Sequence, residues 1–324
     1  MVHCGPDQLR RSSLPESILP GSNPIATSTD NGSDALFGTL LAQPFSVRKP
    51  TGQPSPFVIA SPHSGRLYPS SFVSRSRLNP LNLRRSEDAF VDELFAAAVD
   101  IGAPLIAAHF PRAFLDVNRA PAEIDAAMFD GPLDVAVDAV SPRVSAGLGV
   151  IPRIVRDGAE IYREKLSARE AEERLAMFYR PYHAALAGLV DATRAEFGAA
   201  VLIDCHSMPS AAAAPDIILG DRYGLSAAPF VTRAAERAFE AEGFHVARNA
   251  PYAGGFTTQL HGRPARGVHA LQIEINRGLY LDEERIERAP QFDQIAARVA
   301  AALQELAKIS RMLERPPGIA HAAE

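Results

Sequence analysis

The sequence predicts an α/β protein in which helices cover a layered sheet. Apolar runs of strand length alternate with segments whose apolar residues recur at helical spacing, which is the pattern of this fold class. Two of the runs end abruptly at a histidine beside small polar residues, as strands do at the ligand-binding edge of an open α/β sheet. The 324 residues, 47% of them hydrophobic, suffice for a sizeable core in one large domain or two modest ones.

Seven strands are expected in chain order. They cover residues 56–60, 104–108, 113–117, 199–203, 215–219, 244–247 and 269–275. The clearest helix runs from Ser86 to Asp100, because apolar residues inside it follow helical spacing and Ser86 is a good N-cap. Helical patterns also cover 168–197, 226–242 and 282–311, and Pro181 is expected to kink or split the first of these.

Composition narrows the class of protein. Residues 1–34 and 313–324 are rich in small polar residues and proline, so we expect loose tails around a single domain at 35–312. The net charge is -5 and the arginines are dispersed, which argues against a nucleic-acid partner. The two cysteines cannot form a disulfide framework, and neither a signal peptide nor a membrane span is visible, so we expect a cytoplasmic protein.

Two histidines follow apolar runs in similar contexts. Phe57 to Ala60 leads to His63, and Val201 to Asp204 leads to His206. A single histidine in this position is more often a packed, hydrogen-bonded residue, but two of them at one sheet edge favour a shared metal. His109 is a weaker version, since bulky Phe110 follows it.

A catalytic zinc usually takes three protein ligands, so a third must be found. Three residues after His63, where many zinc hydrolases carry a carboxylate, the sequence has Arg66. The next acidic residues begin the predicted helix, and Asp88 in its first turn is our choice of ligand. Asp92 and Glu87 remain alternatives, and all these acids could instead cap and solvate the helix.

Glu274 is the candidate general base. It lies in a strand of period two, where Leu271, Ile273 and Ile275 share one face. An ionised carboxylate in such a strand is costly without a partner, so Glu274 either pairs with an arginine such as Arg277 or faces a polar cleft. Beside a metal it would take a proton from water and pass it to a leaving group.

Arginines indicate an anionic substrate. Arg112, Asn118 and Arg119 lie on or just after an expected strand, and arginine suits bidentate carboxylate recognition. The alternative is that Arg119 pairs with Asp116. Glycine-containing loops that include Tyr252 and Arg222 could approach a ligand closely, although as turns they need no function.

Together these segments resemble the N-formylglutamate amidohydrolase family, also called N-formylglutamate deformylases. The resemblance spans about residues 55–285 and rests on Ser61-Pro62-His63-Ser64-Gly65, Glu87-Asp88 to Leu94, Asp116-Val117-Asn118-Arg119-Ala120-Pro121, Ile203-Asp204-Cys205-His206-Ser207-Met208-Pro209, Asp216 to Arg222, Asn249 to Gly255, and Gln272 to Tyr280. The family is similar to zinc carboxypeptidases and aspartoacylases. This likeness implies a mixed, mostly parallel central sheet with helices on both faces.

The resemblance also implies roles for single residues. His63 and His206 match metal-ligand positions, Glu274 matches the general base, and Arg112 stands near an arginine that steadies the oxyanion. Asn118 and Arg119 match a pair that grips a substrate carboxylate, and Arg277 or Arg222 is available for a second one, with Tyr252 nearby in the substrate-binding set. Arg66 departs from the pattern of carboxypeptidases, which place an acidic ligand there.

The implied activity is zinc-dependent hydrolysis of N-formyl-L-glutamate to L-glutamate and formate, a step of histidine degradation, in a single catalytic domain at 35–312. Zn²⁺ or another divalent metal is the expected cofactor, and a small acidic N-acyl amino acid is the expected partner. Three alternatives stay open: a deacylase acting on another N-acyl amino acid, a non-catalytic dicarboxylate-binding protein, and an interaction protein whose alanine-rich helices pack in an oligomer.

Overall fold

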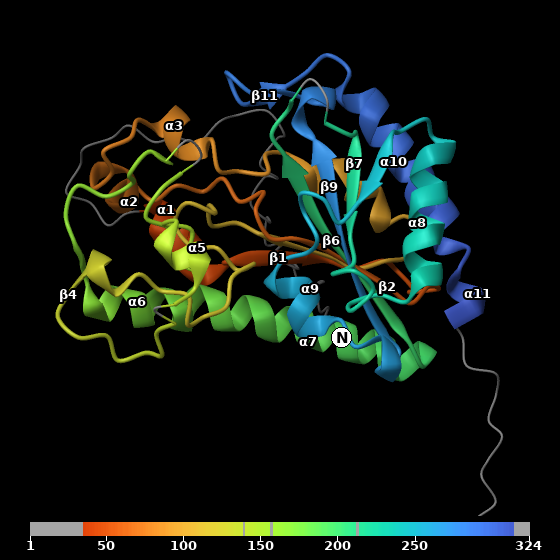
Figure 1. The fold of residues 1–324 in the computed structure, drawn as a ribbon, viewed down its shortest axis with the longest axis horizontal. Helices are drawn as coiled ribbons and strands as arrows, with labels where there is room; N and C mark the ends of the chain where they lie inside the picture. Colours follow the sequence, from red (N-terminus) through yellow and green to blue (C-terminus); the bar gives the residue numbers. More distant parts are fainter. Residues whose placement is uncertain (1–34, 139, 156–157, 212–213, 314–324) are drawn as a thin grey trace, which may run out of the picture.

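The computed structural model describes residues 35–138, 140–155, 158–211 and 214–313. Their centre is a seven-stranded sheet (Figure 1). In spatial order its strands are β1 (Phe45–Arg48), β3 (Leu105–Ala108), β2 (Phe57–Ser61), β6 (Ala200–Met208), β9 (Val268–Asn276), β7 (Ile217–Gly220) and β8 (Val246–Arg248). Strands β3, β2, β6 and β9 are parallel, whereas β1 and β7 are antiparallel to their neighbours β3 and β9. The expected mixed, mostly parallel sheet is confirmed.

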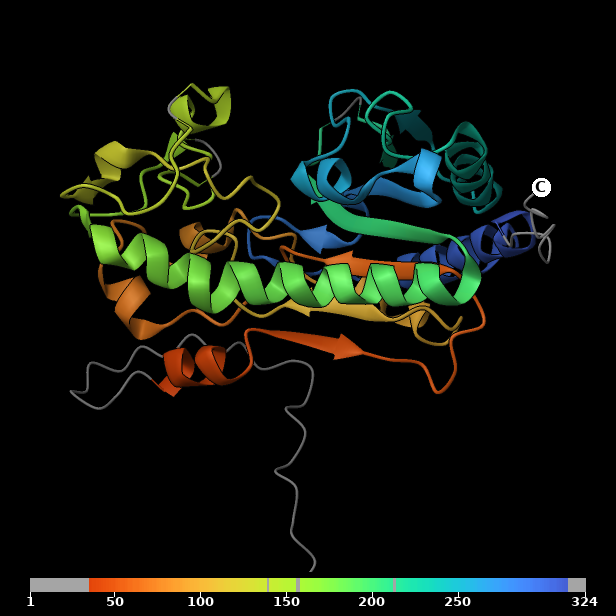
Figure 2. The ribbon, with the colours of Figure 1, turned by 90° about the horizontal axis from the view of Figure 1, so that it is seen from below.

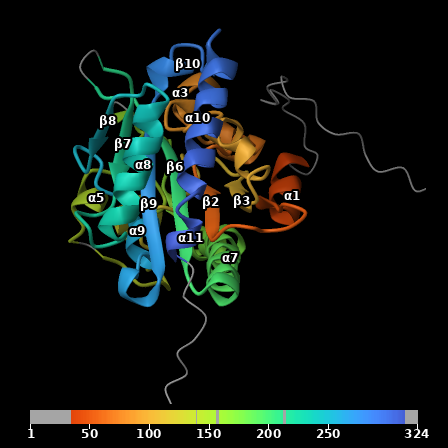
Figure 3. The same cartoon turned by 90° about the vertical axis from the view of Figure 1, so that its right-hand side faces the viewer.

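Helices cover both faces of this sheet. They are α1 (Ala35–Ala42), α2 (Ser70–Ser74), α3 (Pro80–Arg84), α4 (Val91–Leu94), α5 (Pro142–Ser145), α6 (Ala168–Arg174), α7 (Arg180–Phe197), α8 (Pro229–Ala241), α9 (Phe256–His261), α10 (Phe292–Ala307) and α11 (Ser310–Leu313). Figure 2 shows α7 as the long green helix along one side, and Figure 3 shows α8 and α10 together on the opposite side. Among the described residues, no helix combines the length and apolarity needed to cross a membrane.

Two small ladders lie outside the central sheet. One pairs β4 (Phe129–Asp130) with β5 (Leu166–Ser167), and the other pairs β10 (Leu281–Asp282) with β11 (Glu287–Arg288). The first belongs to the loop-rich lobe at the end of α6, and the second leads into α10 (Figure 1).

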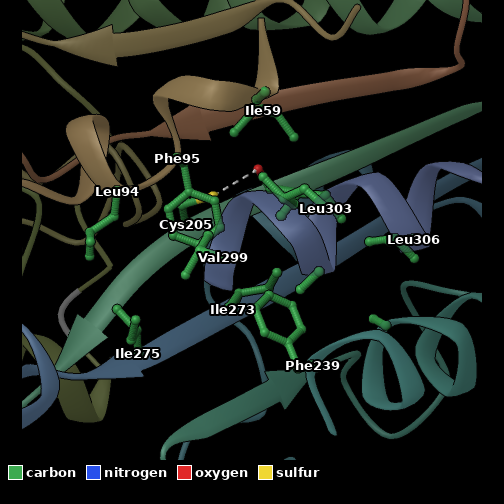
Figure 4. Packing of buried hydrophobic residues seen from close by; sticks show 14 of the residues in the cluster. Ile59, Leu94, Phe95, Cys205, Phe239, Ile273, Ile275, Val299, Leu303 and Leu306 are labelled. Carbon is green, nitrogen blue, oxygen red and sulfur yellow. Dashed lines mark hydrogen bonds between the residues drawn. The ribbon is translucent and has the colours of Figure 1, made fainter. Parts of the chain in front are cut away.

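Alternation along the strands divides the core into two apolar layers. Ile203 and Cys205 of β6 pack with α4, α8 and α10, whereas Leu202 points to the layer under α7. Figure 4 shows the first layer, with Cys205 among Phe95, Ile273 and Val299. Burying each large apolar side chain stabilises the fold by about 1.5–3 kcal/mol, and a slip of one residue would move all of them to the wrong face. The register that positions the polar ends of these strands is therefore firmly fixed.

Two predicted elements are wrong. Residues 113–117 are buried but form turns rather than a strand, with the Phe114 and Leu115 amides donating to the Pro111 carbonyl. The predicted helix at Ser86–Asp100 is reduced to α4 and a 3-10 turn at Ala96–Ala98, preceded by Phe90 in a left-handed conformation. The cause is tertiary, because the Asp88 amide donates to the His63 carbonyl and its side chain is bound by histidines. These contacts hold the first predicted turn out of the helix.

The other expected elements appear with shifted ends. Strand β6 extends five residues past its predicted end at 203, to Met208, and α10 begins only at Phe292 because β10 and β11 precede it. Pro181 lies in the first turn of α7, and a π-helical turn at Leu175–Tyr179 separates α7 from α6. Helical structure is nevertheless continuous from Ala168 to Phe197, so the helix is not split at this proline and a π-helical turn precedes it instead. The tails expected at 1–34 and 313–324 lie outside the described residues, except for Leu313, which ends α11.

Candidate functional site

Parallel strands bring the candidate residues to one edge of the sheet. His63 follows the end of β2, His206 lies near the end of β6, and Glu274 lies near the end of β9. His206 and Glu274 are partners in the parallel register, so the histidine and the carboxylate project from neighbouring strands on the same face. This edge is where open α/β sheets bind ligands.

Three of the side chains form a buried group that we call the metal cluster: His63, Asp88 and His206. The Nδ1 atoms of the two histidines are 3.1 Å apart, and Asp88 Oδ2 lies 3.2 Å from His63 Nδ1 and 3.0 Å from His206 Nδ1. Two ring nitrogens and a carboxylate oxygen in such contact either share protons or converge on a cation. The three atoms therefore have the arrangement of metal ligands.

The spacing also fits a small divalent ion. Tetrahedral zinc with bonds of about 2.0–2.1 Å separates neighbouring ligand atoms by roughly 3.3 Å, which is close to the separations within the metal cluster. Two histidines and one carboxylate are a known donor set of hydrolytic zinc sites, which leave a fourth position for water or substrate. Asp88, rather than Asp92 or Glu87, is the carboxylate that the fold brings to the two histidines.

Glu87 and Asp92, the two alternatives for the third metal ligand, lie outside the metal cluster. Glu87 is buried, but it accepts hydrogen bonds from Tyr68 and from Arg84, with which it forms an ion pair. Asp92 lies 3.9 Å from Arg66 Nη2, and Arg66 donates to Glu93. Arg66 is therefore held by the acids of α4 and stays apart from the metal cluster.

A second pair of carboxylates orients the histidines. His63 Nε2 lies 2.8 Å from Asp116 Oδ1, and His206 Nε2 lies 2.9 Å from Asp204 Oδ2. Each ring thus has a carboxylate behind the nitrogen that faces away from the metal cluster, which orients the ring so that Nδ1 faces the cluster. The side-chain amide of Asn118 also contacts His206 Nε2, at 3.1 Å.

Asp88 is further held by Arg277 and Ser207. Arg277 Nη2 donates to Asp88 Oδ1 at 3.0 Å, and the Ser207 hydroxyl donates to the same oxygen at 3.2 Å. Burial acts to raise the pKa of Asp88, but hydrogen bonds with His206 and His63 hold the pKa well below its ordinary value. One oxygen is thus fixed by Arg277 and Ser207, while the other faces the histidines.

Glu274 has a different environment. Its carboxylate accepts a hydrogen bond from Gln272 Nε2 at 2.8 Å, and it lines the cavity beside the metal cluster. Burial is the main cause that raises the pKa of Glu274, to about 7, and nearby Asp88 raises it further while His206 opposes the shift. A carboxyl group poised near neutrality is suited to accept and return a proton.

The site opens into a cavity of about 580 Å³. Its lining contains His63, Arg112, Asp116, Asn118, Arg119, Arg143, His206, Tyr252, Glu274 and Arg277. Arg222 lies outside this lining, although its amide donates to the carbonyl of Ala253, which does line the cavity. The fold thus gathers the other predicted site residues around one space or in the metal cluster at its base.

Asn118 and Arg119 are held by backbone groups of other segments of the chain. Asn118 Oδ1 accepts from the Thr257 amide at 2.8 Å, and Arg119 Nε donates to the Leu148 carbonyl at 2.9 Å. Arg112 donates to Asp116, whereas Arg119 Nε is 3.8 Å from the same carboxylate. A side chain at Gly255 would place its Cβ only 2.4 Å from Asn118 Nδ2, so glycine is needed for this close approach.

Three residues that support the site were not selected from the sequence. Asp204 occupies the alternate position before His206, Asp116 lies two residues before Asn118, and Gln272 lies two residues before Glu274. Because strand side chains alternate, the positions of Asp204 and Gln272 placed them on the same faces as His206 and Glu274, a usable signal. Asp116 lies in a turn and gave no comparable periodic signal.

The fold and the site define an α/β protein with a candidate metal centre at the carboxyl edge of its sheet, open to an arginine-rich cavity. The sequence profile of the N-formylglutamate amidohydrolase family matches residues 55–281. An N-formylglutamate deformylase of Pseudomonas aeruginosa is 33% identical over 240 residues, covering 71% of this chain and 83% of the relative. Another, from Pseudomonas putida, is 29% identical over 237 residues, with 70% and 82% covered.

Solved structures agree. The crystal structure of N-formylglutamate amidohydrolase from Ralstonia eutropha JMP134 superposes with a TM-score of 0.78 at 36% identity, covering 83% of this chain and 99% of that one. The gene product Atu2144 from Agrobacterium tumefaciens has the same fold, with a TM-score of 0.61 at 18% identity over 85% of this chain and 96% of its own. The chain belongs to the N-formylglutamate amidohydrolase family and is an amidohydrolase.

Proposed function

We propose that this protein hydrolyses N-formyl-L-glutamate to L-glutamate and formate, with Zn²⁺ or another divalent metal held by His63, Asp88 and His206. The observation that carries the proposal is the buried metal cluster beside Glu274, at the base of a cavity rich in arginine. The relatives named above are N-formylglutamate deformylases, which supports the choice of substrate. In this proposal the enzyme acts in the cytoplasm, in histidine degradation.

A divalent metal bound by the three ligands would supply a Lewis acid and lower the pKa of a bound water toward ~7. Glu274, with its pKa raised to about 7, accepts the proton of the attacking water and delivers it to the leaving amine. The C–N bond of the formamide breaks, and the products are formate and the free amino group.

Arginines of the cavity complete the proposed site. Arg112 lies beside Asp116 at the metal end and stabilises the negative charge that develops on the formyl oxygen. Asn118 and Arg119 hold a carboxylate of the substrate, and Tyr252 lines the same space. Arg277 contributes by holding Asp88 in place. Arg222 acts through the loop of Ala253, since its side chain is outside the cavity lining.

The test combines metal analysis with product formation. Purified protein is expected to contain one divalent metal per chain and to release formate from N-formyl-L-glutamate. A Glu274→Gln variant is expected to retain the metal and to lose about 10²–10⁴-fold in kcat, the usual contribution of a general base. Glu87→Gln is a matched control, because Glu87 is also a buried carboxylate but does not line the cavity.

The outcomes separate the alternatives. If the protein holds no divalent metal and releases no formate, the proposed activity is wrong. This is also the result that a non-catalytic dicarboxylate-binding protein would give. Protein that holds metal but removes an acetyl or succinyl group faster than a formyl group would retain the mechanism and lose the proposed substrate. Unchanged kcat in Glu274→Gln would remove Glu274 from the role of base.

A further inference from the structure

The cavity carries more positive charge than one substrate carboxylate needs. Five arginines line it, at positions 85, 112, 119, 143 and 277, against two carboxylates, Asp116 and Glu274. A surplus of guanidinium groups in a cavity of this size favours a ligand with two negative charges. The structure then raises the question of which arginine meets the second carboxylate.

Arg277 and Arg119 have most of their donors in use, whereas Arg112 uses one of them. All three nitrogens of Arg277 have partners: Nε donates to Ser207, Nη1 to the Arg85 carbonyl and Nη2 to Asp88. Arg119 uses Nε and Nη1 on backbone carbonyls, and Arg112 uses Nε on Asp116. Arg277 therefore cannot turn to a substrate carboxylate without releasing a ligand of the metal cluster, whereas Arg112 and Arg119 remain suited to the end nearest the metal.

Arg143 is placed differently. It lies on the short helix α5, and its side chain is 43% exposed. In the part of the chain that the structure describes, its guanidinium has one partner, Glu123 Oε1, at 3.3 Å from Nη1. Glu123 is itself held by the Ser141 hydroxyl and the Ala120 amide. The remaining donors of the planar group are thus available beside a fixed counter-charge.

The position of Arg143 suits the outer part of the substrate. Leu148, Pro152 and Ile154 come from the same loop and line the same cavity. Arg119 and Arg143 line the same cavity, and the positive charge of Arg143 also contributes to lowering the pKa of Arg119, after burial and Arg112. A substrate whose first carboxylate lies on Arg119 can therefore extend a second carboxylate toward Arg143.

We propose that Arg143 is the specificity-determining residue that binds the side-chain carboxylate of the substrate and selects acidic N-formyl amino acids over neutral ones. The inference rests on the proposed function and assigns one residue within it. Arg143 acts through a charge-assisted hydrogen bond that the substrate gains in place of water. Because the arginine is partly exposed, it sets a preference rather than an absolute requirement.

The experiment measures kcat/KM for N-formyl-L-glutamate and for N-formyl-L-glutamine, which has the same shape and lacks the second charge. The wild-type protein is expected to prefer the glutamate substrate, and Arg143→Gln is expected to reduce this preference by about 10- to 100-fold, the size of one charge-assisted hydrogen bond. Arg143→Lys, which keeps the charge and loses the planar fork, is expected to retain part of the preference.

Two control variants isolate the effect. Arg153→Gln removes an arginine of similar exposure from the same loop, where it pairs with Asp125 outside the cavity, and is expected to keep the wild-type preference. Arg119→Gln is expected to slow both substrates together, because both carry the first carboxylate. Circular dichroism and metal content check that each variant is folded.

The two levels of the proposal fail in different ways. If the wild-type protein releases no formate from either substrate, the proposed function is wrong. If the wild-type protein prefers N-formyl-L-glutamate and folded Arg143→Gln keeps that preference in full, the proposed function stands and the role of Arg143 is wrong. A preference lost in Arg119→Gln and kept in Arg143→Gln would likewise assign the second carboxylate to Arg119.

Discussion

The metal cluster and the arginines that line the cavity are built in contrasting ways. His63, Asp88 and His206 are at most 3% exposed. His206 lies in β6, His63 lies in the loop directly after β2, and the amide of Asp88 is bound to the His63 carbonyl. The arginine wall, by which we mean Arg112, Arg119 and Arg143, comes from loops and a one-turn helix, and two of its side chains are 26% and 43% exposed. Burial at the ends of two central strands thus fixes the groups that need precise placement, while more exposed loops carry those that recognise charge.

The largest effect is expected from breaking the metal cluster itself. Asp88→Ala removes one of the three proposed metal ligands and also leaves Arg277 without its buried ion-pair partner. We expect loss of bound metal and a decrease of about 3–5 kcal/mol in the free energy of unfolding. Metal analysis and urea unfolding measure the two effects. Asp92→Ala is the matched control in α4, and an equal loss of metal in that variant would contradict the assignment of Asp88.

Protonation of His183 is expected to destabilise the loop that carries Asn118 and Arg119. His183 of α7 contacts the Val117 carbonyl through Nε2 at 2.9 Å and so ties the loop of Asn118 and Arg119 to the helix. Burial lowers the pKa of His183 to about 4, below its value of about 6.5 when unfolded. The unfolded chain therefore binds a proton first as the pH falls, and stability present above pH ~6.5 is lost between pH ~6.5 and ~4.

The shift in the pKa of His183 sets an upper limit on this loss of stability. It amounts to up to about 3 kcal/mol for the single histidine. Urea unfolding at pH 7 and pH 4.5 of the wild-type protein and of His183→Gln measures it, since the variant is expected to lose less stability over that interval. An identical pH dependence in both proteins would show that His183 is not responsible.

A smaller effect is expected when only the orientation of a ligand is disturbed. Asp116→Asn keeps the shape of the side chain behind His63 but removes the charge that supports its ring. We expect metal affinity to fall about 10- to 100-fold, as for other carboxylates that orient ligating histidines. Competition with a metal chelator measures the change. Glu123→Gln, on the arginine side, is the comparison variant and is expected to bind metal as the wild type does.

The smallest effect is expected at the edge of the arginine wall. The Tyr179 hydroxyl donates to the Arg119 carbonyl at 2.8 Å. Tyr179→Phe removes this hydrogen bond, which is worth about 1 kcal/mol, and is expected to raise KM by a few-fold without changing metal content. Steady-state kinetics measure the shift. A change in metal content would mean that the loop transmits the change to the metal cluster through the contacts of Asp116 and Asn118 with the histidines.

The sequence could reveal the site residues that lie at or near strand ends, because these follow local patterns. His63, His206 and Glu274 were found because strand endings and period-two alternation are local patterns that the fold preserves. Asp88, chosen from the sequence, also belongs to the metal cluster. It was chosen as a residue in the first turn of a long helix, but in the structure it precedes the short helix α4. Its position depends on His63, which is distant in sequence.

Other features had no local signal. The edge strand β1 and the helix α1 precede the first predicted strand and were not expected. Residues 113–117 have the apolar character of a strand, but the chain buries them in turns beneath the cavity. The commitment of Arg277 to Asp88 joins residues 189 positions apart, so no pattern within the strand could separate it from an arginine free to bind substrate.

The nine-residue pairing of β6 with β9 constrains how this enzyme can change in length. The two strands pair residue for residue from Ala200 with Val268 to Met208 with Asn276. One inserted residue within β9 before Glu274 would turn the carboxylate toward the apolar layer, because side chains alternate. Length variation is therefore tolerable in the loop of Arg143 and prohibitive in the two central strands. Libraries that seek new substrates should accordingly insert and delete residues around α5 while keeping both strands at fixed length.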